Sequence, residues 1–459
     1  MRRAVIVGGG ISGLSAAYDL TRASLPCTLI EREERLGGVI VTETVAGCLV
    51  EGGPDSFLSA KPWAMELIAE LGLADEVIGS NDHLRRTYIL RRGRLVPLPE
   101  GLLMMIPTRI GPLLGTRLLG WRTKLRMGLE LLRRPEAAPR ADRSVAEMIE
   151  DHYGRETLDY LAEPLLAGIY GGAPEELSAP SVLARFVEME TRHGSLTRGV
   201  LRERRAASDD GKMPLFRTLR GGMGRLVEAL ESAIRPAAEI RRGTAEALEA
   251  GGQGFRVRVD GEWLEAAQVV LACPAWRAAA LARGIDGELA GLLESIPYTS
   301  SMTVALGYGR REIGHPLDGF GFLVPRRERK RLVATTWVGT KFDHRAPAGH
   351  ALLRCFLGGA GQEAVIEEDD GKVVDAVREE LRGILGLSAA PLFTRVRRWR
   401  RSMAQYTVGH AGRVEAIEAR LRDLPGLHLA GNACHGIGVP DCIRSGRLAA
   451  SRARLLMAN

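Results

Sequence analysis

The sequence lacks paired cysteines. Its six cysteines are scattered along 459 residues, and neither a Cys-x-x-Cys pair nor a histidine spacing typical of zinc sites accompanies them. This pattern argues against a zinc module and against a disulfide-stabilised secreted scaffold. It predicts reduced thiols in a cytoplasmic protein and no metal site.

Long hydrophobic runs are also missing. The best candidate, residues 102–121, is interrupted by two prolines and two arginines, which excludes a membrane-spanning helix. The apolar run after Met1 ends at once in glycines and shows no signal-peptide cleavage site. Residues 117–134 alternate leucines with basic residues at helical spacing around Trp121. They predict either a solvated helix or a peripheral helix on the inner face of a membrane.

Positive charge is in modest excess, since 63 Lys and Arg residues face 56 Asp and Glu residues and give a formal net charge of +7. This excess favours anionic ligands or an anionic membrane surface. No nucleic-acid-binding motif accompanies it, so we expect no nucleic-acid partner. At this length, two or three interleaved domains are expected.

The first 31 residues predict a strand, a glycine turn, a helix and a second strand. The turn consists of Gly8, Gly9, Gly10, Ile11, Ser12 and Gly13, and matches the G-x-G-x-x-G fingerprint of dinucleotide-binding folds. Free N–H groups at the helix N-terminus would hold a diphosphate. Glu31, at the end of the second strand, would accept hydrogen bonds from the ribose hydroxyls and repel the 2′-phosphate of NADP.

The same fingerprint serves FAD and NAD, so later segments must decide between them. A second diglycine, Gly37-Gly38, follows Glu31 closely, and Leu429-Ala430-Gly431-Asn432 precedes a helix that carries Ser445-Gly446. Both segments resemble those of the flavin amine oxidase superfamily. The resemblance implies FAD as cofactor.

Residues 359–364 formally match G-x-G-x-x-A and could indicate a second nucleotide site for NAD(P)H. No ribose-binding acid follows at the end of a strand, so we interpret this segment as a hairpin or loop. Without NAD(P)H, electrons would leave the flavin to O2 or to another acceptor.

Four blocks narrow the resemblance to the protoporphyrinogen oxidase family, and they are spread over almost the full length of the chain. They are residues 51–57 (EGGPDSF), 319–325 (GFGFLVP), 405–410 (QYTVGH) and 436–443 (GIGVPDCI). Val39 stands where amine oxidases usually have an arginine, which argues against an amine oxidase. A carotenoid or phytoene desaturase and an amine oxidase-like flavoenzyme remain the alternative enzymes, and a non-catalytic porphyrin-binding flavoprotein remains an alternative of another class.

The resemblance implies which residues contact FAD. Besides the glycine turn, they are Glu31, Arg32, Gly38, Val39, Gly53, Pro54, Asp55, Ser56, Glu246, Asn432, Ile437, Gly438 and Val439. Glu246 corresponds to a family position that holds the adenine through its backbone. Cys434 and His435 could form a catalytic pair, but we expect them to line the flavin pocket, because no orienting partner is evident.

The family activity is the six-electron oxidation of a porphyrinogen to a porphyrin in haem biosynthesis. By resemblance, Phe320, Gly321, Leu323 and Phe356 would clamp the flat macrocycle, and Lys61 and Arg86 would bind its propionates. The flavin carries the redox chemistry, so we assign no protein acid or base. The substrate is coproporphyrinogen III or protoporphyrinogen IX, and the GPDSFL stretch slightly favours the former.

These segments predict an α/β fold with a discontinuous Rossmann-like FAD-binding domain. We expect that domain to comprise residues 1–80, 210–285 and 422–459. A mixed-sheet substrate domain would comprise residues 81–97 and 286–421, and a helical domain, with a possible membrane contact, residues 98–209. Residues 198–212, which are polar and basic, predict a loose connection, and residues 263–271 predict one strand.

Overall fold

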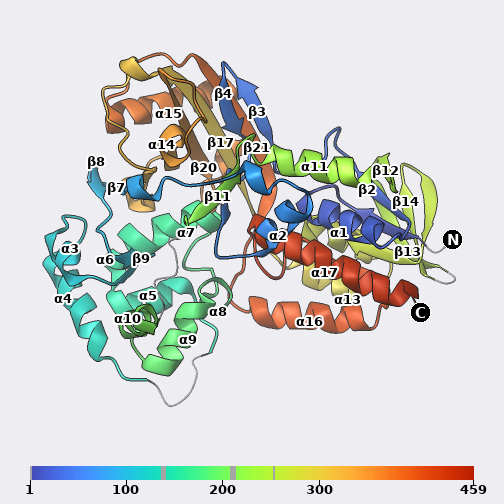
Figure 1. Ribbon diagram of the computed structural model, residues 1–459. Coiled ribbons are helices and arrows are strands. Elements are labelled where there is room, and N and C mark those ends of the chain that lie inside the picture. The colour runs from blue at the N-terminus through green and yellow to red at the C-terminus, as the bar shows by residue number, and fades with distance from the viewer. Residues whose placement is uncertain (1–2, 136–140, 207–212, 252–253, 459) are drawn as a thin grey trace.

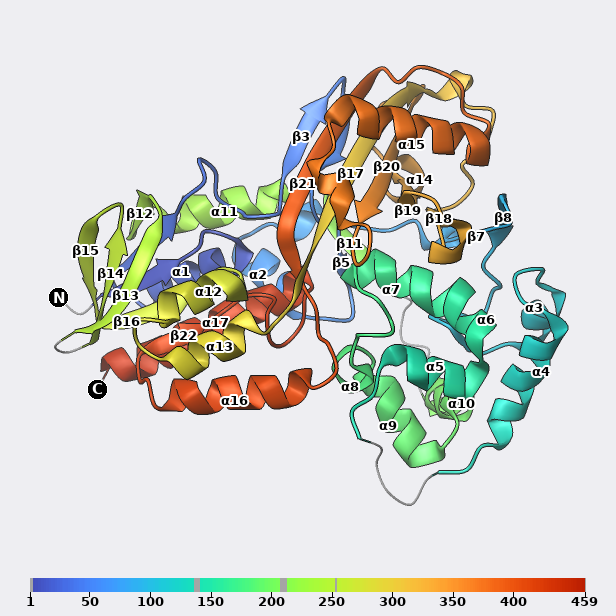
Figure 2. The same ribbon diagram turned by 180° about the vertical axis from the view of Figure 1, so that it is seen from behind.

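The computed structural model describes residues 3–135, 141–206, 213–251 and 254–458. Three regions follow one another across the molecule (Figure 1). The two chain ends lie together on the right of that view, a large sheet with β17, β20 and β21 lies at the top, and helices α3 to α10 lie at the lower left. Figure 2 shows the same regions from behind.

A five-stranded parallel sheet joins segments from the beginning, middle and end of the chain. Its order is β12 (Ala238–Arg242), β2 (Cys27–Glu31), β1 (Ala4–Val7), β16 (Gln268–Leu271) and β22 (Leu427–Leu429). All four residues of β1 are buried, as expected for a parallel strand covered on both faces. The α/β class and the discontinuous nucleotide-binding fold are thus confirmed.

Helices cover one face of this sheet. They are α1 (Ile11–Arg22), α2 (Trp63–Glu70), α11 (Gly224–Ile234) and α17 (Val439–Ala458), and their apolar residues share one core with β1 and β2. Helix α17 crosses α1 so closely that a Cβ atom on Gly446 would lie 2.0 Å from the Ser12 carbonyl oxygen. Only glycine permits this crossing.

The other face is covered by helices and a small antiparallel sheet. The helices are α12 (Ala275–Ala282), α13 (Gly287–Glu294) and α16 (His410–Arg422), and the sheet contains β13 (Ala245–Gly251), β14 (Gly254–Val259) and β15 (Glu262–Ala266). The prediction of one strand over residues 263–271 is wrong. The chain turns between β15 and β16, where the Ala267 N–H donates to the Arg3 carbonyl at 2.9 Å.

A seven-stranded mixed sheet forms the second region. Its order is β21 (Phe393–Ala404), β17 (Tyr298–Gly309), β20 (His350–Gly358), β19 (Leu332–Trp337), β18 (Gly321–Leu323), β7 (Thr87–Arg91) and β8 (Arg94–Pro97). Neighbouring strands are antiparallel except β18 and β7. Helix α15 (Asp370–Leu385) packs its apolar stripe on one face. The loop after β20 leads into a 3-10 turn (Glu363–Glu367), which confirms the loop interpretation of residues 359–364.

The helical region has a core of its own. It contains α3 (Ile110–Gly115), α4 (Trp121–Leu129), η3 (Glu130–Leu132), α5 (Val145–Tyr153), α6 (Arg155–Thr157), η4 (Leu158–Ala162), α7 (Glu163–Tyr170), α8 (Ala179–Val182), α9 (Ala184–His193) and α10 (Leu196–Ala206). Within the described ranges, no helix is both long and apolar enough to cross a bilayer.

Shorter elements connect the regions. They are the hairpins β3 (Thr42–Val45) with β4 (Cys48–Glu51) and β9 (Leu102–Leu103) with β10 (Ile106–Pro107), the sheet of β5 (Phe57–Leu58), β11 (Phe216–Leu219) and β6 (Val77–Gly79), and helix α14 (Val338–Lys341).

The prediction of a loose connection is wrong for residues 198–206, which belong to α10; residues 207–212 lie outside the described ranges. Leu196 and Val200 pack into the helical core. The buried Glu130 carboxylate accepts hydrogen bonds from the Leu196 N–H at 2.7 Å and the Ser195 hydroxyl at 2.8 Å at the start of this helix. A carboxylate there satisfies free N–H groups and complements the helix dipole.

The same carboxylate is part of a buried chain of charges. Nδ1 of His152 lies 2.9 Å from Glu130, and its Nε2 lies 3.0 Å from Glu190. Burial alone would lower the pKa of His152, but these two carboxylates outweigh it and raise the pKa above its usual 6.5. His152 therefore links α5 to η3 and α9, and the two carboxylates favour its protonated form.

Replacing His152 with Gln should destabilise the helical region by about 3 kcal/mol near pH 6, because it leaves the buried Glu130 carboxylate without a counter-charge. The stabilising effect of the raised pKa is full below pH 6.5 and is lost as the pH rises through the folded-state value. Urea unfolding at about pH 6 and about pH 9 should therefore show a gap between the natural and variant chains that shrinks at the higher pH. The exposed His83→Gln serves as control, and a pH-independent gap for His152→Gln would contradict this account.

Candidate functional site

The glycine turn after β1 lies at the carboxyl edge of the parallel sheet. A Cβ atom on Gly8 would lie 2.5 Å from the Ala272 carbonyl oxygen, and one on Gly13 would lie 1.9 Å from the Gly8 carbonyl oxygen. The turn can therefore be this tight only with glycine at both positions. Ile11, Ser12 and Gly13 form the first turn of α1, as the fingerprint requires.

Glu31 ends β2 beside this turn. One carboxylate oxygen accepts from the Gly9 N–H at 2.7 Å and the other from the Glu33 N–H at 2.9 Å. The Gly243 N–H donates to the Glu31 carbonyl at 2.9 Å. This hydrogen bond places the turn between β12 and β13 next to Glu31, and Glu246 follows just after that turn. Glu246 itself is exposed and pairs with Arg258 at 2.9 Å. Arg32 lies at the surface and pairs with Glu33.

The second diglycine packs against the first. Gly10 and Gly37 form a parallel bridge, and a Cβ atom on Gly38 would lie 3.2 Å from the Gly10 Cα atom. Arg35 holds the loop by donating to the carbonyls of Leu36, Gly38 and Ile40. The two glycine segments predicted to follow the diphosphate therefore lie side by side.

The residues at this edge fit a dinucleotide. Gly10 is the N-cap residue of α1, and no described side chain caps this N-terminus. A Cβ atom on Gly10 would meet nothing closer than the Gly38 Cα at 4.0 Å, so the space beside the first N–H groups is open. Such a cradle of free N–H groups with an acid at the next strand end suits the diphosphate and ribose of FAD.

The segment Gly53-Pro54-Asp55-Ser56 follows β4 and is fixed from two sides. A Cβ atom on Gly53 would lie 1.7 Å from the Val39 carbonyl oxygen, so the two predicted FAD segments touch through their backbones. From the large sheet, Trp399 Nε1 and Thr303 Oγ1 both donate to the Gly52 carbonyl at 2.9 Å. The segment therefore lies between the nucleotide region and the large sheet.

Asp55 forms a largely buried ion pair that the sequence did not suggest. Both of its carboxylate oxygens lie 3.0 Å from Lys341 Nζ, and Ser56 Oγ donates to it at 2.6 Å. Burial alone would raise the pKa of Asp55, but the charges of Lys341 and Arg354 outweigh burial and hold this pKa well below its usual range. Asp55 is therefore ionised over the whole physiological pH range.

Residues 430–438, between β22 and α17, form a loop that two tyrosines hold in place. The Tyr406 hydroxyl donates to the Asn432 carbonyl at 2.8 Å and accepts from the Gly436 N–H at 2.7 Å, and the Tyr298 hydroxyl lies 3.2 Å from Asn432 Oδ1. His410 stacks on the Tyr406 ring with 4.0 Å between ring centres. The block at residues 405–410 thus positions the loop that carries predicted FAD contacts.

At the end of this loop, Ile437, Gly438 and Val439 lead into α17. Asp441 accepts from the Gly438 N–H at 3.2 Å and pairs with Lys61. Lys61, predicted to bind a propionate, is therefore linked to a predicted FAD contact through Asp441.

The predicted apolar substrate residues lie together at the large sheet. Leu323, Ala334, Phe356 and Thr303 are direct cross-strand neighbours on four adjacent strands, so their side chains share one face. Gly321 lies on the same face. The Phe320 N–H donates to the Arg86 carbonyl at 2.8 Å, whereas the Arg86 side chain is exposed and pairs with Asp318 at 2.6 Å.

The neighbouring Cys434 and His435 do not form a pair that resembles a nucleophile and its base. Burial raises the pKa of Cys434 to about 12, and His435 Nε2 pairs with Glu418 at 3.0 Å. Cys434 lines a cavity of about 270 Å³ between α16 and α17, together with Cys273, Leu429 and Leu448.

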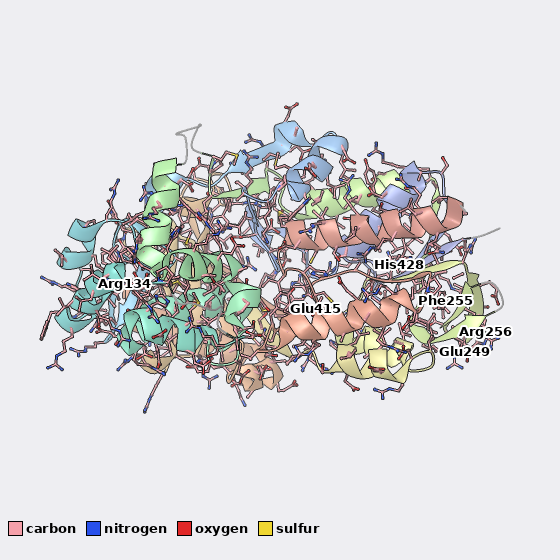
Figure 3. All side chains as sticks on the ribbon, turned by 90° about the horizontal axis from the view of Figure 1, so that it is seen from below. Arg134, Glu249, Phe255, Arg256, Glu415 and His428 are labelled. Carbon is pink, nitrogen blue, oxygen red and sulfur yellow. The ribbon has the colours of Figure 1, made fainter. Side chains whose placement is uncertain are left out.

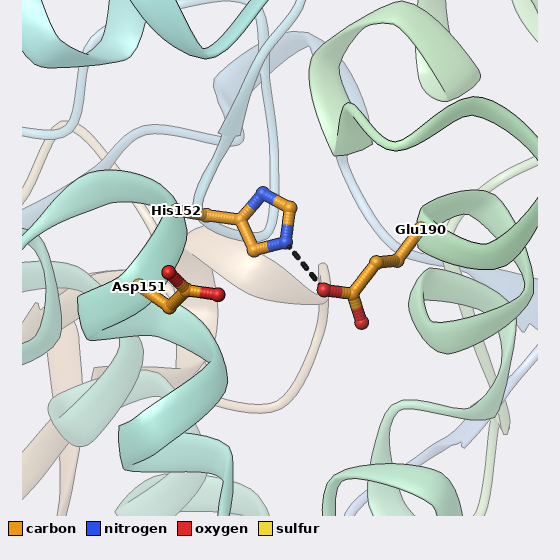
Figure 4. Close-up of side chains that lie close together, drawn as sticks. All are labelled: Asp151, His152 and Glu190. Atoms are coloured by element: carbon orange, nitrogen blue, oxygen red, sulfur yellow. Dashed lines mark hydrogen bonds and ion pairs between the residues drawn. The ribbon is translucent and has the colours of Figure 1, made fainter. Parts of the chain in front are cut away.

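A second cluster of potential ligands lies in the helical region, where Asp151, His152 and Glu190 converge (Figure 4). Cations of the protein already neutralise its carboxylates. Arg143 contacts Glu190 at 2.6 Å and Asp151 at 3.3 Å, and Arg133 contacts Asp151. The cluster is best described as an ion-pair network.

Arg354 and Lys341 contact the predicted FAD segment, and sequence reasoning missed both. Arg354 donates to the Gly53 carbonyl from the middle of β20. A single charge within the apolar run ALLRCFL was the signal that could have identified it. Lys341 offers no comparable signal, because only the fold brings it to Asp55.

Comparisons with known proteins agree with this geometry. The family model described as flavin containing amine oxidoreductase matches residues 11–454. Coproporphyrinogen III oxidase of Bacillus subtilis (strain 168) is 34% identical, and the match covers 98% of each chain. The coproporphyrinogen III oxidase of Staphylococcus aureus is 30% identical, and the match covers 97% of each chain.

Solved structures show the same relationship. A crystal structure from Exiguobacterium sp. 255-15 that carries a protoporphyrinogen oxidase name has a TM-score of 0.89 and 32% identity, and covers 100% of this chain and 99% of that one. A putrescine oxidase at 18% identity, with a TM-score of 0.73 and coverage of 100% and 99%, shares the fold. The resemblance and the FAD cofactor inferred from the sequence are confirmed. The chain belongs to the family of flavin-containing amine oxidoreductases and is an oxidoreductase that uses FAD.

Proposed function

We propose that this enzyme oxidises a porphyrinogen to the porphyrin, and that coproporphyrinogen III is its preferred substrate. One observation carries the proposal: the row of Leu323, Ala334 and Phe356 adjoins Thr303, which donates to the carbonyl of Gly52 at the predicted flavin segment. A flat apolar wall beside a flavin suits a disc-shaped tetrapyrrole. The names of the B. subtilis and S. aureus relatives favour coproporphyrinogen.

We propose that FAD lies along the carboxyl edge of the parallel sheet. The glycine turn with Ile11 and Ser12 would hold the diphosphate, and Glu31, with Arg32 nearby, the ribose. The backbone near Glu246 would meet the adenine. The flavin would meet the segments around Gly38 and Val39, around Gly53 to Ser56, and from Asn432 to Val439. The domain boundaries expected from the sequence are part of this proposal.

When bound, FAD supplies the capacity to accept a hydride, that is, two electrons per round. Converting a porphyrinogen to a porphyrin removes six electrons and six protons, so three rounds are needed. With O2 as the acceptor, three O2 become three H2O2 and the balance closes. The protein's part is to hold the macrocycle against the row of Leu323, Ala334 and Phe356 and to exclude water from the reacting face.

The ionised Asp55 carboxylate would also stabilise positive charge that develops on the substrate during its oxidation. Hydride loss from a saturated meso carbon leaves positive charge on the macrocycle. A carboxylate kept ionised by Lys341 can stabilise that charge without taking up a proton.

We also propose that the helical region contacts an anionic membrane surface. Trp121, Leu125, Leu129 and Leu132 follow one another at helical spacing along α4 and η3 and are 55–75% exposed. Arg122 lies over the Trp121 ring, and Arg117 and Arg134 are exposed nearby. Arg134 lies at the opposite end of the molecule from Glu249 and Arg256 beside the nucleotide region (Figure 3). An exposed apolar stripe flanked by cations is typical of interfacial helices.

Glu31→Ala should weaken FAD binding about tenfold, because it removes the ribose acceptor and the partner of the Gly9 N–H. FAD affinity is measured by fluorescence titration of the apoprotein. Glu33→Ala, which changes a neighbouring exposed carboxylate, is the matched control. Equal affinities for the two variants would remove Glu31 from the proposed site.

Anaerobic mixing with coproporphyrinogen III should bleach the flavin band, and protoporphyrinogen IX should bleach it more slowly. Benzylamine and the already oxidised coproporphyrin should leave the band unchanged, because the first lacks a macrocycle and the second has no hydride to give. Stopped-flow absorbance provides the rates. Bleaching by the amine alone would point to an amine oxidase and end the porphyrinogen proposal.

The triple change Trp121→Ser, Leu125→Ser and Leu129→Ser should abolish sedimentation with phosphatidylglycerol vesicles, since it removes the exposed apolar stripe. The double change Leu455→Ser and Leu456→Ser on α17 removes exposed leucines elsewhere and should leave sedimentation intact. If the natural chain does not sediment with these vesicles at low salt, the membrane proposal is wrong.

A further inference from the structure

Arg354 is an anomaly in the large sheet. Arg354 is only 4% exposed, and its Nη2 donates to the Gly53 carbonyl. Its guanidinium carbon lies 4.7 Å from the centre of the Phe356 ring. Among the described residues, its buried Nε has no hydrogen-bond partner, and no carboxylate lies within the 4.0 Å that defines an ion pair. The charge is therefore buried without a direct counter-ion.

The two acids whose charges act on Arg354 are already engaged. Asp55 contacts Lys341 with both oxygens at 3.0 Å, and Glu51 contacts Arg345 at 3.1 Å. They act on Arg354 only from a longer range, and burial lowers the pKa of Arg354. A guanidinium removed from water needs acceptors for its five N–H groups and an anion for its charge. The geometry of this site lacks such an anion.

The register of the sheet places Arg354 on the proposed substrate wall. Arg354 is the direct neighbour of Ala305 on one side and of Thr336 on the other, and Thr336 faces Gly321. This row runs parallel to the row of Leu323, Ala334 and Phe356, two residues along each strand, so both rows point to the same face. The missing anion would thus lie where the macrocycle is proposed to bind.

Substrate chemistry supplies an anion of this kind. Coproporphyrinogen III carries one propionate on each of its four pyrroles, whereas protoporphyrinogen IX carries two propionates on adjacent pyrroles. A disc bound flat against the wall would turn part of its rim toward solvent, here called the mouth, and part toward the protein interior. The two-carboxylate substrate can keep both charges at the mouth, but the four-carboxylate substrate must direct carboxylates inward.

The cations predicted from the sequence are engaged elsewhere. Lys61 pairs with the buried Asp441, and Arg86 pairs with Asp318 at the surface. Neither side chain offers an unpaired charge near Arg354 on the proposed substrate wall.

We propose that Arg354 binds an inward-directed propionate and thereby selects a four-carboxylate porphyrinogen over a two-carboxylate one. The inference rests on the proposed porphyrinogen oxidation and deepens it. The planar guanidinium group of an arginine can donate two parallel hydrogen bonds to one carboxylate, whereas the ammonium group of a lysine cannot. For a two-carboxylate substrate, an apolar substituent would face the unpaired charge, which disfavours binding.

The test compares kcat/KM for coproporphyrinogen III and for mesoporphyrinogen IX, which has ethyl groups in place of two propionates. In Arg354→Met, kcat/KM for coproporphyrinogen should fall about 100-fold, because a buried carboxylate loses its charged partner. The value for mesoporphyrinogen should stay close to that of the natural chain or rise. Arg354→Lys should retain part of the preference.

Arg395→Met is the matched control. Arg395 is the neighbour of Ala305 on the opposite side, in the same row as Arg354, but it pairs with Glu43 at 3.2 Å. Its replacement should leave the ratio of the two kcat/KM values unchanged. FAD content and the thermal midpoint of each variant establish that it is folded.

Two results would overturn the inference. One is an equal loss for both substrates in Arg354→Met together with a shifted flavin midpoint potential, which would assign Arg354 to the flavin. The other is a natural chain that oxidises mesoporphyrinogen at least as efficiently as coproporphyrinogen, which requires no variant. If the natural chain oxidises neither porphyrinogen, the proposed function itself fails, and this outcome is distinct from the first two.

Discussion

The architecture depends on parallel pairing between strands that are far apart in the sequence. β1 pairs with β16, and β16 pairs with β22, so one sheet contains the beginning, the middle and the end of the chain. Parallel strands end at the same edge, and therefore the turn after β1, the acid that ends β2 and the loop after β22 converge there. The close crossing of α1 and α17 at Gly446 fixes this arrangement.

A second constraint sets the distance between this edge and the large sheet. The Gly53 backbone presses against Val39 on one side, while Thr303, Trp399 and Arg354 hold Gly52 and Gly53 from the other. These contacts set the position of the segment relative to both regions. A flavin on one side and a substrate on the other would therefore meet at a fixed separation, which hydride transfer requires.

Buried charge concentrates at this junction. Glu51 with Arg345, Asp55 with Lys341, and Arg354 all lie where the nucleotide region meets the sheet. Removing such groups from water is unfavourable, and partners compensate this only when the geometry is good. Ion pairs with sequence separations of 286 and 294 residues also tie the two regions together. The ion pairs that join the two regions and the arginine proposed to recognise substrate thus lie at the same junction.

The sequence alone determined the elements whose signals are local. The G-x-G-x-x-G turn, the acid at the end of β2 and the second diglycine are read within forty residues, because backbone approach and strand ends depend on immediate neighbours. Family-like blocks predicted the C-terminal loop and most residues of the proposed substrate wall. Local signals failed for α10, whose formation depends on Glu130 and on packing in the helical core.

Only the tertiary structure decided which charges meet. Lys61 pairs with Asp441, Lys341 pairs with Asp55, and Arg354 donates a hydrogen bond to the Gly53 carbonyl. No sequence spacing predicts these three contacts. The free energy of a buried charge depends on the dielectric environment and on partners brought in from distant segments, and both exist only in the folded chain.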